Sequence, residues 1–467
     1  MDTTYDVKFW KTSVYAGKTK TTYTVRWELE GKEWRKPFAK AALADSFRAG
    51  LVTAASKGEA FSLTTGLPVS YQSRAAGVKW YDFATQFVDQ LWERTSANNR
   101  RNVAKALTPV TIALLRSQPT AFQGVDVRRA LREYAFNTRR RDQAPPEVAV
   151  ILRWVQRNSL VMAAWEDESI VEAALRAAGT KLDGTPVAAS SARRTKRVLN
   201  VFFEYAVKKK VLKENPLPKG KGASSTAAKT SSAVDKRSLL NSEQAAGLLG
   251  WVYARPRGGR RLHTFFATMY YAGARPEEVV AIDVGDVRLP APDAEDQWGE
   301  LLLHTAHPEV GKRWTDTGEV RERRGLKARA ADDTRTVPCR PALTRILRAH
   351  IEKEGLKPGD LLMQGEKGGD LAGSVIRRAW RRARKEVLTP YEFGTPLGRR
   401  VYDLRHTCLT NWLNAGVPAA TVAEWAGNSV PVLLTTYARC IDGQLDDLKR
   451  RIEEAGELGD PARLGAS

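Results

Sequence analysis

The sequence predicts a multidomain, mainly α-helical protein with small β elements. Its 467 residues are enough for roughly two to four domains of ~100–200 residues each. Near the N-terminus apolar and polar residues alternate as in strands, whereas from Trp80 onward apolar residues recur at helical spacing. The stretch 216–237 is rich in Pro, Gly, Ser and Lys and has no periodicity. We therefore expect a flexible, basic linker at 218–237 that separates two folded parts of the chain.

The first module is predicted over residues 1–65. Three alternating stretches separated by short turns predict a three-stranded antiparallel meander: YDVKFWKTSVY, TTYTVRWELE and KEWRKPF. A helix should follow and cover one face of the sheet with Leu43, Phe47, Leu51 and Val52. This β-β-β-α module fits either a generic capping domain or a nucleic-acid-binding sheet, and its many lysines and arginines favour the second.

The second module, residues 78–217, is predicted to be an all-helical bundle. Phe83, Phe87 and Leu91 recur every fourth residue and form one apolar face. Basic runs accompany the helical pattern at 98–105, 137–142, 191–197 and 206–213. A charge run is usually only a solvated face, but four such runs in one helical domain favour a face that contacts DNA.

The third module, residues 238–455, is predicted to be mixed α/β and mainly helical. Asn241 or Ser242 is a candidate N-cap, and the helix HTFFATMYYAGA is apolar on nearly every side, so it should be buried. The stretches 300–306 and 333–339 have strand character, and the polar insertion between them should form a mobile loop. Helices dominate from Pro341 onward.

Charge and cysteine usage limit the class of protein. The net charge is +22, from 75 Lys and Arg against 53 Asp and Glu, and the sequence pI is near 9.9, so the partner should be a polyanion. Nucleic acid and an acidic membrane surface both qualify, but no apolar run approaches the ~18 residues of a membrane span, and a basic-then-apolar signal peptide is lacking. Cys339, Cys408 and Cys440 lack CxxC spacing, and five histidines are scattered. We expect no metal site, no disulfide framework and a cytoplasmic location.

Two short segments of the third module carry candidate cations. Arg275 follows a turn of small residues and precedes a helix that contains Glu277 and Glu278. Because the helix dipole disfavours a cation at this end, a carboxylate or another anion should compensate the arginine. Lys327 lies at the edge of a predicted β-hairpin, where an ordinary edge-strand lysine is the alternative interpretation.

Two further segments contain the remaining candidate site residues. In VYDLRHTCLTNWLNAGV, Arg405 and His406 lie at the start of a helix. In AEWAGNSVPVLLTTYARC, Tyr437 follows an apolar run and has polar neighbours. This tyrosine either packs its ring inside and finds a partner for its hydroxyl, as buried tyrosines usually do, or serves as a nucleophile whose hydroxyl stays accessible.

In this order the segments resemble the tyrosine recombinase, or phage integrase, family, and in particular integrases of actinobacterial mobile elements. The family pattern is an arginine after a small-residue turn, a hairpin lysine, a His-x-x-Arg box and a tyrosine, which Arg275, Lys327, Arg405 and Tyr437 match. The surrounding LKxR…RTVP and YDLRHT…LNAGVP…VAEWAGNS also look like such integrases. The resemblance is strong over 238–450 and implies an arm-type DNA-binding role for the first module and core-site DNA binding for the second.

Two positions depart from the family pattern. Tyr402 stands where the family commonly has histidine, and Asn428 stands nine residues before the tyrosine, where the family has histidine or tryptophan. A phenol of pKa ~10 is a poor base at neutral pH and an amide exchanges no proton, although both can hydrogen-bond a phosphate oxygen. His406 is a substitute base, but we expect it to point away from position 402 around the helix.

The resemblance implies a site-specific DNA recombinase or integrase that cuts and rejoins DNA through a 3′-phosphotyrosyl intermediate and integrates or excises a mobile element, with no cofactor. The implied partners are double-stranded DNA attachment sites, on which the protein is a homotetramer, in the bacterial cytoplasm near the nucleoid. A directionality factor or a DNA-bending protein is left open. The alternatives are a type IB topoisomerase-like enzyme, which nicks and rejoins DNA, and a catalytically idle, sequence-specific DNA-binding regulator.

The residue pattern at 440–460 predicts a short amphipathic helix. Leu445, Leu448 and Ile452 recur at helical spacing, with acidic residues before basic ones. This helix packs either onto its own domain or, as in similar recombinases, onto a neighbouring protomer.

Overall fold

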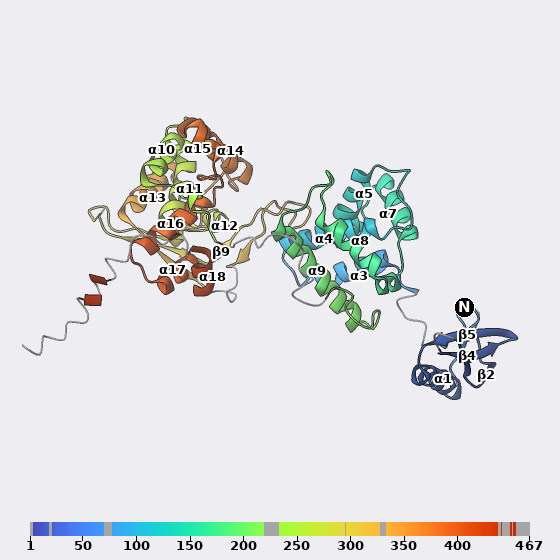
Figure 1. The fold of residues 1–467 in the computed structure, drawn as a ribbon. Helices are drawn as coiled ribbons and strands as arrows, with labels where there is room; N and C mark the ends of the chain where they lie inside the picture. Colours follow the sequence, from blue (N-terminus) through green and yellow to red (C-terminus); the bar gives the residue numbers. More distant parts are fainter. Residues whose placement is uncertain are drawn as a thin grey trace, which may run out of the picture. The chain divides into compact units, whose positions relative to one another are not determined.

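The computed structural model describes residues 3–17, 21–69, 77–218, 233–294, 296–326, 333–437, 440, 449–450 and 452–453. The chain divides into two compact units, Met1–Ala228 and Lys229–Ser467. Helices dominate both units, with small sheets in each (Figure 1), so the predicted multidomain, mainly helical class is confirmed. Among the described residues no helix combines the length and apolar character that a membrane crossing requires.

The N-terminal sheet has a break in its first strand that the sequence pattern did not show. Its strands are β2 (Val7–Phe9), β3 (Ser13–Ala16), β4 (Thr21–Leu29) and β5 (Lys32–Phe38), and β4 pairs antiparallel with the other three. Ser13 follows Phe9 by four residues, whereas their partners on β4, Thr24 and Trp27, are three apart. The extra residue is a bulge, so β2 and β3 are two halves of the predicted first strand.

The helix α1 (Ala41–Ser56) covers this sheet with two of the four predicted residues, Phe47 and Leu51. Its buried residues are Ala44, Leu51 and Ala54, while Leu43 and Val52 are exposed. The two alanines have no bulky side chain to hold the helix away from Trp27 of β4, which lies in the same core cluster. The prediction was wrong only at Leu43 and Val52, because it counted large apolar residues and left out the two alanines. The short strands β1 (Thr3–Thr4) and β6 (Phe61–Ser62) pair beside this core.

The helical bundle is built around aromatic side chains. Its described helices are α3 (Trp80–Trp92), α4 (Ala97–Ala113), α5 (Gly124–Ala130), η2 (Leu131–Ala135), α6 (Thr138–Arg141), α7 (Pro146–Asn158), η3 (Met162–Glu166), α8 (Glu168–Gly179) and α9 (Ala189–Lys208). Phe83 and Phe87 of α3 meet Phe202 of α9 with ring centroids 5.5 and 5.1 Å apart. The predicted apolar face of α3 is thus confirmed, because edge-on aromatic packing fills the interior between the two helices.

The C-terminal unit surrounds one buried helix. Its described helices are η5 (Lys236–Ser238), α10 (Ser242–Tyr253), α11 (Gly259–Ala272), α12 (Pro276–Val279), η6 (Val284–Asp286), α13 (Pro341–Glu354), α14 (Gly373–Val387), α15 (Pro390–Gly394), α16 (Asp403–Asn414), α17 (Ala419–Ala426) and α18 (Val430–Tyr437). Phe265, Phe266 and Met269 of α11 are fully buried, as its sequence predicted. Asn241 caps α10 in a capping box with Gln244, which confirms the predicted helix start.

Small sheets complete this unit. The strands β7 (Val287–Arg288), β8 (Gly299–Leu303) and β11 (Arg335–Cys339) form an antiparallel sheet in the order β11-β8-β7. β9 (Thr305–Ala306) pairs with β10 (Arg324–Gly325). Along β11 burial alternates, with Arg335, Val337 and Cys339 facing inward, so this strand directs an arginine into the interior of the unit.

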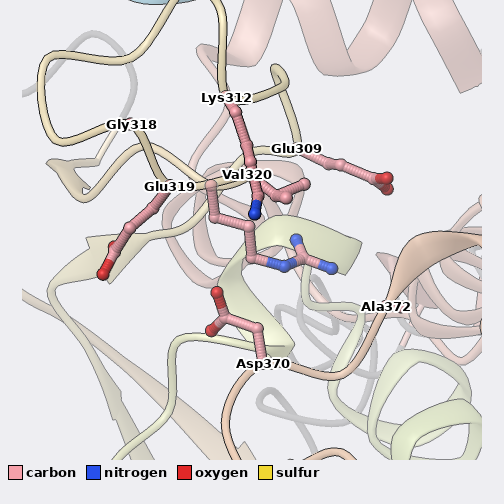
Figure 2. A pocket seen from close by; sticks show the side chains of 8 residues that line it. Glu309, Lys312, Gly318, Glu319, Val320, Asp370 and Ala372 are labelled. Atoms are coloured by element: carbon pink, nitrogen blue, oxygen red, sulfur yellow. The ribbon is translucent and has the colours of Figure 1, made fainter.

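The insertion expected to be a mobile loop is tied down in its described part. Val310 and Trp314 are buried, and Arg321 is 6% exposed. Arg321 donates from Nη1 to the His307 carbonyl at 2.7 Å and from Nη2 to the Leu371 carbonyl at 2.6 Å. Lys312, Glu319 and Asp370 surround an open pocket of about 330 Å³ here (Figure 2). Hydrogen bonds to backbone carbonyls leave no pattern in a sequence, which is why the sequence predicted a mobile loop here.

Candidate active site

Arg275 lies at the start of α12 and is compensated by a carboxylate of the same helix. Its Nη1 lies 2.7 Å from Glu278 Oε1, and its backbone N–H donates to Glu278 Oε2 at 2.8 Å. Glu278 is 1% exposed. Burial acts to raise the pKa of Glu278, but the charges of Arg335 and Arg275 outweigh it and lower this pKa to about 2. The carboxylate expected beside Arg275 is therefore present and ionised.

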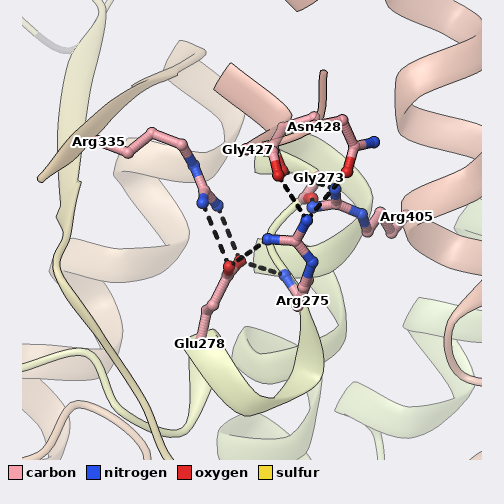
Figure 3. A network of polar contacts seen from close by, with 8 residues as sticks. Gly273, Arg275, Glu278, Arg335, Arg405, Gly427 and Asn428 are labelled. Carbon is pink, nitrogen blue, oxygen red and sulfur yellow. Dashed lines mark hydrogen bonds and ion pairs between the residues drawn. The ribbon is translucent and has the colours of Figure 1, made fainter. Parts of the chain in front are cut away.

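The outer end of Arg275 reaches a second segment of the chain. Its Nη2 donates to the Gly427 carbonyl at 2.7 Å and to Asn428 Oδ1 at 2.9 Å (Figure 3). Gly427 ends α17 at a φ of 63°, a left-handed conformation that favours glycine. Asn428 thus contacts Arg275, and this contact also orients its side-chain amide.

Arg405 of α16 is fully buried beside Arg275. It donates from Nη1 to the Gly273 carbonyl and from Nη2 to the Ala426 carbonyl, the latter at 2.7 Å. Its Nε is buried and has no hydrogen-bond partner in the described structure. Figure 3 shows Arg405 next to Arg275, with Gly273 and Asn428 close to both. Two permanent cations therefore share one small region.

Tyr437, at the end of α18, is buried and hydrogen-bonded to a histidine. Its hydroxyl lies 2.8 Å from His406 Nδ1, and the residue is only 2% exposed. The expectation of an accessible hydroxyl is therefore wrong for this structure. The ring packs in a core cluster with Val422 and Leu433, so the apolar run before Tyr437 carries the tyrosine inward with it.

Tyr402, the residue before α16, lies on the same side of the helix axis as His406 of α16. Their ring centroids are 5.0 Å apart in an edge-to-face contact. The expectation that His406 points away from position 402 is wrong, because residues four apart on a helix are neighbours. Tyr402, His406 and Tyr437 consequently form one row of rings.

The electrostatics keep His406 neutral at ordinary pH. Burial is the main cause, followed by the charges of Arg400 and Arg405, and together they lower the pKa of His406 to about 4. Burial also raises the pKa of Tyr437, although the charge of Arg405 opposes this. At neutral pH the phenol is therefore protonated and the imidazole neutral, so the phenol can donate its proton to the imidazole nitrogen.

This arrangement predicts a pH effect on stability. A histidine whose folded pKa is about 4, below its unfolded value of ~6.5, binds fewer protons in the folded state. Folding stability should then fall as pH drops from about 6.5 towards 4. His406→Gln removes the titrating group but keeps a polar side chain. When the pH is lowered from about 7.5 to about 5, the unfolding temperature of this variant should fall less than that of the unchanged protein. Equal decreases in calorimetry would show that His406 is not buried neutral.

Sequence reasoning missed one member of the site. Arg335 of β11 donates a two-pronged contact to Glu278, from Nη2 to Oε2 at 2.8 Å and from Nη1 to Oε1 at 3.2 Å. The alternating strand RTVPC was a usable signal, because it places Arg335 on the same inward face as Val337. Lys327, the remaining predicted site residue, lies outside the described residues.

The described end of the predicted linker is attached to the tyrosine's helix. The Val234 N–H donates to the Thr436 carbonyl at 2.8 Å, and the Cys440 thiol lies 3.7 Å from the Val234 carbonyl. Val234 also packs in the core cluster that contains Tyr437. The polypeptide that enters the C-terminal unit is thus in direct contact with the segment that carries the tyrosine.

Comparison with known proteins finds similar solved structures. No family model and no curated protein matches the chain. A Tn1549 transposon integrase in complex with transposon right end DNA is 16% identical, with a TM-score of 0.46, over 68% of this chain and 96% of that one. The XerH site-specific recombinase bound to a palindromic difH substrate is 15% identical, with a TM-score of 0.44, over 78% and 96%. A lambda integrase tetramer bound to a Holliday junction is 15% identical, with a TM-score of 0.42, over 89% and 95%.

With every one of these three TM-scores below 0.5, the chemistry assigned to the site depends on its own geometry.

Proposed function

We propose that the protein is a tyrosine-type site-specific DNA recombinase that cuts and rejoins DNA through a 3′-phosphotyrosyl intermediate. The observation that carries this proposal is the convergence of Arg275, Arg405, His406 and Tyr437 from three segments of the chain. A phosphodiester under attack gains negative charge on its nonbridging oxygens, and two guanidiniums are suited to stabilise that charge. A tyrosine hydroxyl next to a neutral imidazole supplies the nucleophile and a proton acceptor.

The proposed reaction conserves the bond energy of the DNA strand. The Tyr437 oxygen forms a bond to phosphorus while the bond from phosphorus to the 5′ oxygen breaks, and the phenol proton passes to His406 Nδ1. In this proposal Lys327 donates a proton to the leaving 5′ oxygen, as the family resemblance implies. Rejoining reverses these steps, so neither ATP nor a metal ion is needed to restore the phosphodiester.

The buried tyrosine implies a conformational step before cleavage. A hydroxyl on a residue that is 2% exposed cannot meet a DNA phosphate, so α18 or the Tyr437 side chain must move when DNA binds. The movement has to keep the hydroxyl within hydrogen-bond reach of His406 Nδ1, now 2.8 Å away, because this nitrogen is the proposed proton acceptor. The resting protein therefore keeps its nucleophile protonated and away from solvent.

Exposed cations in each unit support a DNA-binding role. On the N-terminal sheet Arg35 of β5 is exposed on the face opposite the buried Trp27, and it lies across from Arg26 of β4, which is partly exposed and forms an ion pair with Glu33 at 2.7 Å. In the C-terminal unit α14 buries Ile376 and Trp380 and exposes five cations: Arg377, Arg378, Arg381, Arg382 and Lys385. One-sided basic surfaces of this kind match a phosphate backbone.

Affinity for duplex DNA should consequently depend steeply on salt. Each phosphate neutralised by Lys or Arg releases counterions, so the logarithm of the binding constant should fall with the logarithm of salt concentration at a slope of about −0.9 per phosphate. Fluorescence anisotropy across a salt series measures this slope. An affinity that barely changes with salt would argue against DNA held through its phosphates.

Two alternatives are separated by the products formed. A recombinase exchanges strands between two attachment sites. We propose that this protein does so as a homotetramer on DNA, and that it integrates or excises a mobile element in the bacterial cytoplasm. A type IB topoisomerase-like enzyme relaxes supercoiled DNA without paired sites. A catalytically idle regulator binds its site and makes no covalent adduct. Incubation with paired candidate sites, supercoiled plasmid and nicked duplex therefore distinguishes the three.

A further inference from the structure

Two arginines share the single carboxylate of Glu278. Arg335 is 2% exposed and Glu278 is 1% exposed, and the two form a closely spaced ion pair with a shortest distance of 2.8 Å. The same carboxylate contacts Arg275 Nη1 at 2.7 Å (Figure 3). Counting the Arg275 backbone N–H, the two oxygens of Glu278 accept four contacts, so no acceptor position on this carboxylate is left for a further approach of Arg275.

We propose that Arg335 is a positioning residue that keeps Arg275 available to a DNA phosphate. This inference rests on the proposed function, because it assigns Arg275 to the phosphate. Arg335 itself is buried behind Glu278 and contacts no reacting atom in the proposal. It acts by occupying and neutralising the carboxylate that would otherwise bind Arg275 alone.

The charges explain why this matters. Two guanidiniums and one carboxylate leave a net positive charge in the trio, whereas Arg275 and Glu278 alone form a neutral pair. In a buried site this difference is large, because little water screens it. Without Arg335, the ionised Glu278 should draw Arg275 towards itself and cancel the attraction of Arg275 for the phosphate.

The packing around Gly427 supports the same role. A side chain at Gly427 would collide with Arg335 Nη1 and would lie 3.2 Å from Arg275 Nη1. The carbonyl of this glycine also accepts a hydrogen bond from Arg275 Nη2 at 2.7 Å. The two arginines are thus held side by side against one backbone position, and removal of Arg335 leaves room for Arg275 to shift.

The test compares adduct formation by the full-length protein and its variants on a nicked suicide duplex in single turnover. Arg335→Met should slow adduct formation about 10- to 100-fold and leave the dissociation constant for the duplex nearly unchanged. Arg335→Lys keeps the charge but loses the two-pronged geometry, so it should be intermediate. Arg384→Met is the matched control, since Arg384 is also buried and donates to the Leu397 carbonyl but lies outside the site. It should cleave at the unchanged rate per folded molecule.

A rescue separates positioning from simple loss of structure. In Arg335→Met the harm comes from a Glu278 carboxylate that binds Arg275 alone, so adding Glu278→Gln should restore part of the rate. A double variant as slow as Arg335→Met, or slower, would overturn the inference, and so would an Arg335→Met protein that cleaves as fast as the unchanged one.

A crystal structure of the variant tests the inference without measuring catalysis. If the unchanged protein forms no adduct, the proposed function fails, and the inference is then judged by a crystal structure of Arg335→Met. In that structure Arg275 Nη2 should have left the Gly427 carbonyl and Asn428 Oδ1. Contacts that remain in place, at 2.7 and 2.9 Å in the unchanged protein, would overturn it.

Discussion

Replacing Tyr437 by phenylalanine is expected to abolish the covalent protein–DNA adduct while leaving DNA binding intact. The substitution removes one oxygen, which is the proposed nucleophile, and keeps the ring that packs with Val422 and Leu433. The lost hydrogen bond to His406 should cost only about 0.5–1.5 kcal/mol of folding stability. Denaturing gels after incubation with a nicked suicide duplex detect the adduct, and anisotropy measures the affinity.

The matched control for this variant is Tyr391→Phe. Tyr391 is 83% exposed and lies outside the described site, so its substitution should change neither adduct nor affinity. An adduct that persists in Tyr437→Phe would assign the nucleophile to another residue and remove the basis of the proposed mechanism.

Arg275→Met should have the second largest effect. Loss of one donor to the developing charge on the phosphate should slow cleavage by about 10²–10³-fold, or about 2.7–4 kcal/mol of barrier. The fold should survive, because Glu278 keeps its ion pair with Arg335 at 2.8 Å and is not left as an uncompensated buried charge. Single-turnover cleavage, together with thermal unfolding of the same samples, measures both quantities.

Arg257→Met serves as the control for Arg275. Arg257 forms an ion pair with Glu366 at 2.7 Å, with side chains 85% and 60% exposed, and exposed pairs contribute little to stability. This control should cleave at the rate of the unchanged protein. An Arg275→Met protein that does so as well would exclude Arg275 from the reaction.

The sequence predicted those elements whose cause is local. The capping box at Asn241 and the uniformly apolar helix around Phe265 need only neighbouring residues to be recognised. The carboxylate beside Arg275 followed from the helix dipole and a glutamate three residues away. In each case the interacting groups are close in the chain, so spacing alone identifies them.

What the sequence missed depends on contacts between distant segments. Arg335 meets Glu278 across 57 positions, and Arg405 is held by the carbonyls of Gly273 and Ala426, which carry no side-chain signal. The polar neighbours of Tyr437 suggested an accessible hydroxyl, but the packing of α18 against Val422 decided its burial. The polarity of the neighbouring residues could not reveal that Tyr437 is buried.

The most direct measurement is the identity of the residue joined to DNA. A nicked suicide duplex traps the adduct because the short cleaved strand diffuses away and cannot rejoin. After digestion with protease and nuclease, mass spectrometry should find a single modified peptide, with the nucleotide attached through its 3′ phosphate to Tyr437. A nucleotide attached to any other side chain, or through a 5′ phosphate, would contradict the account.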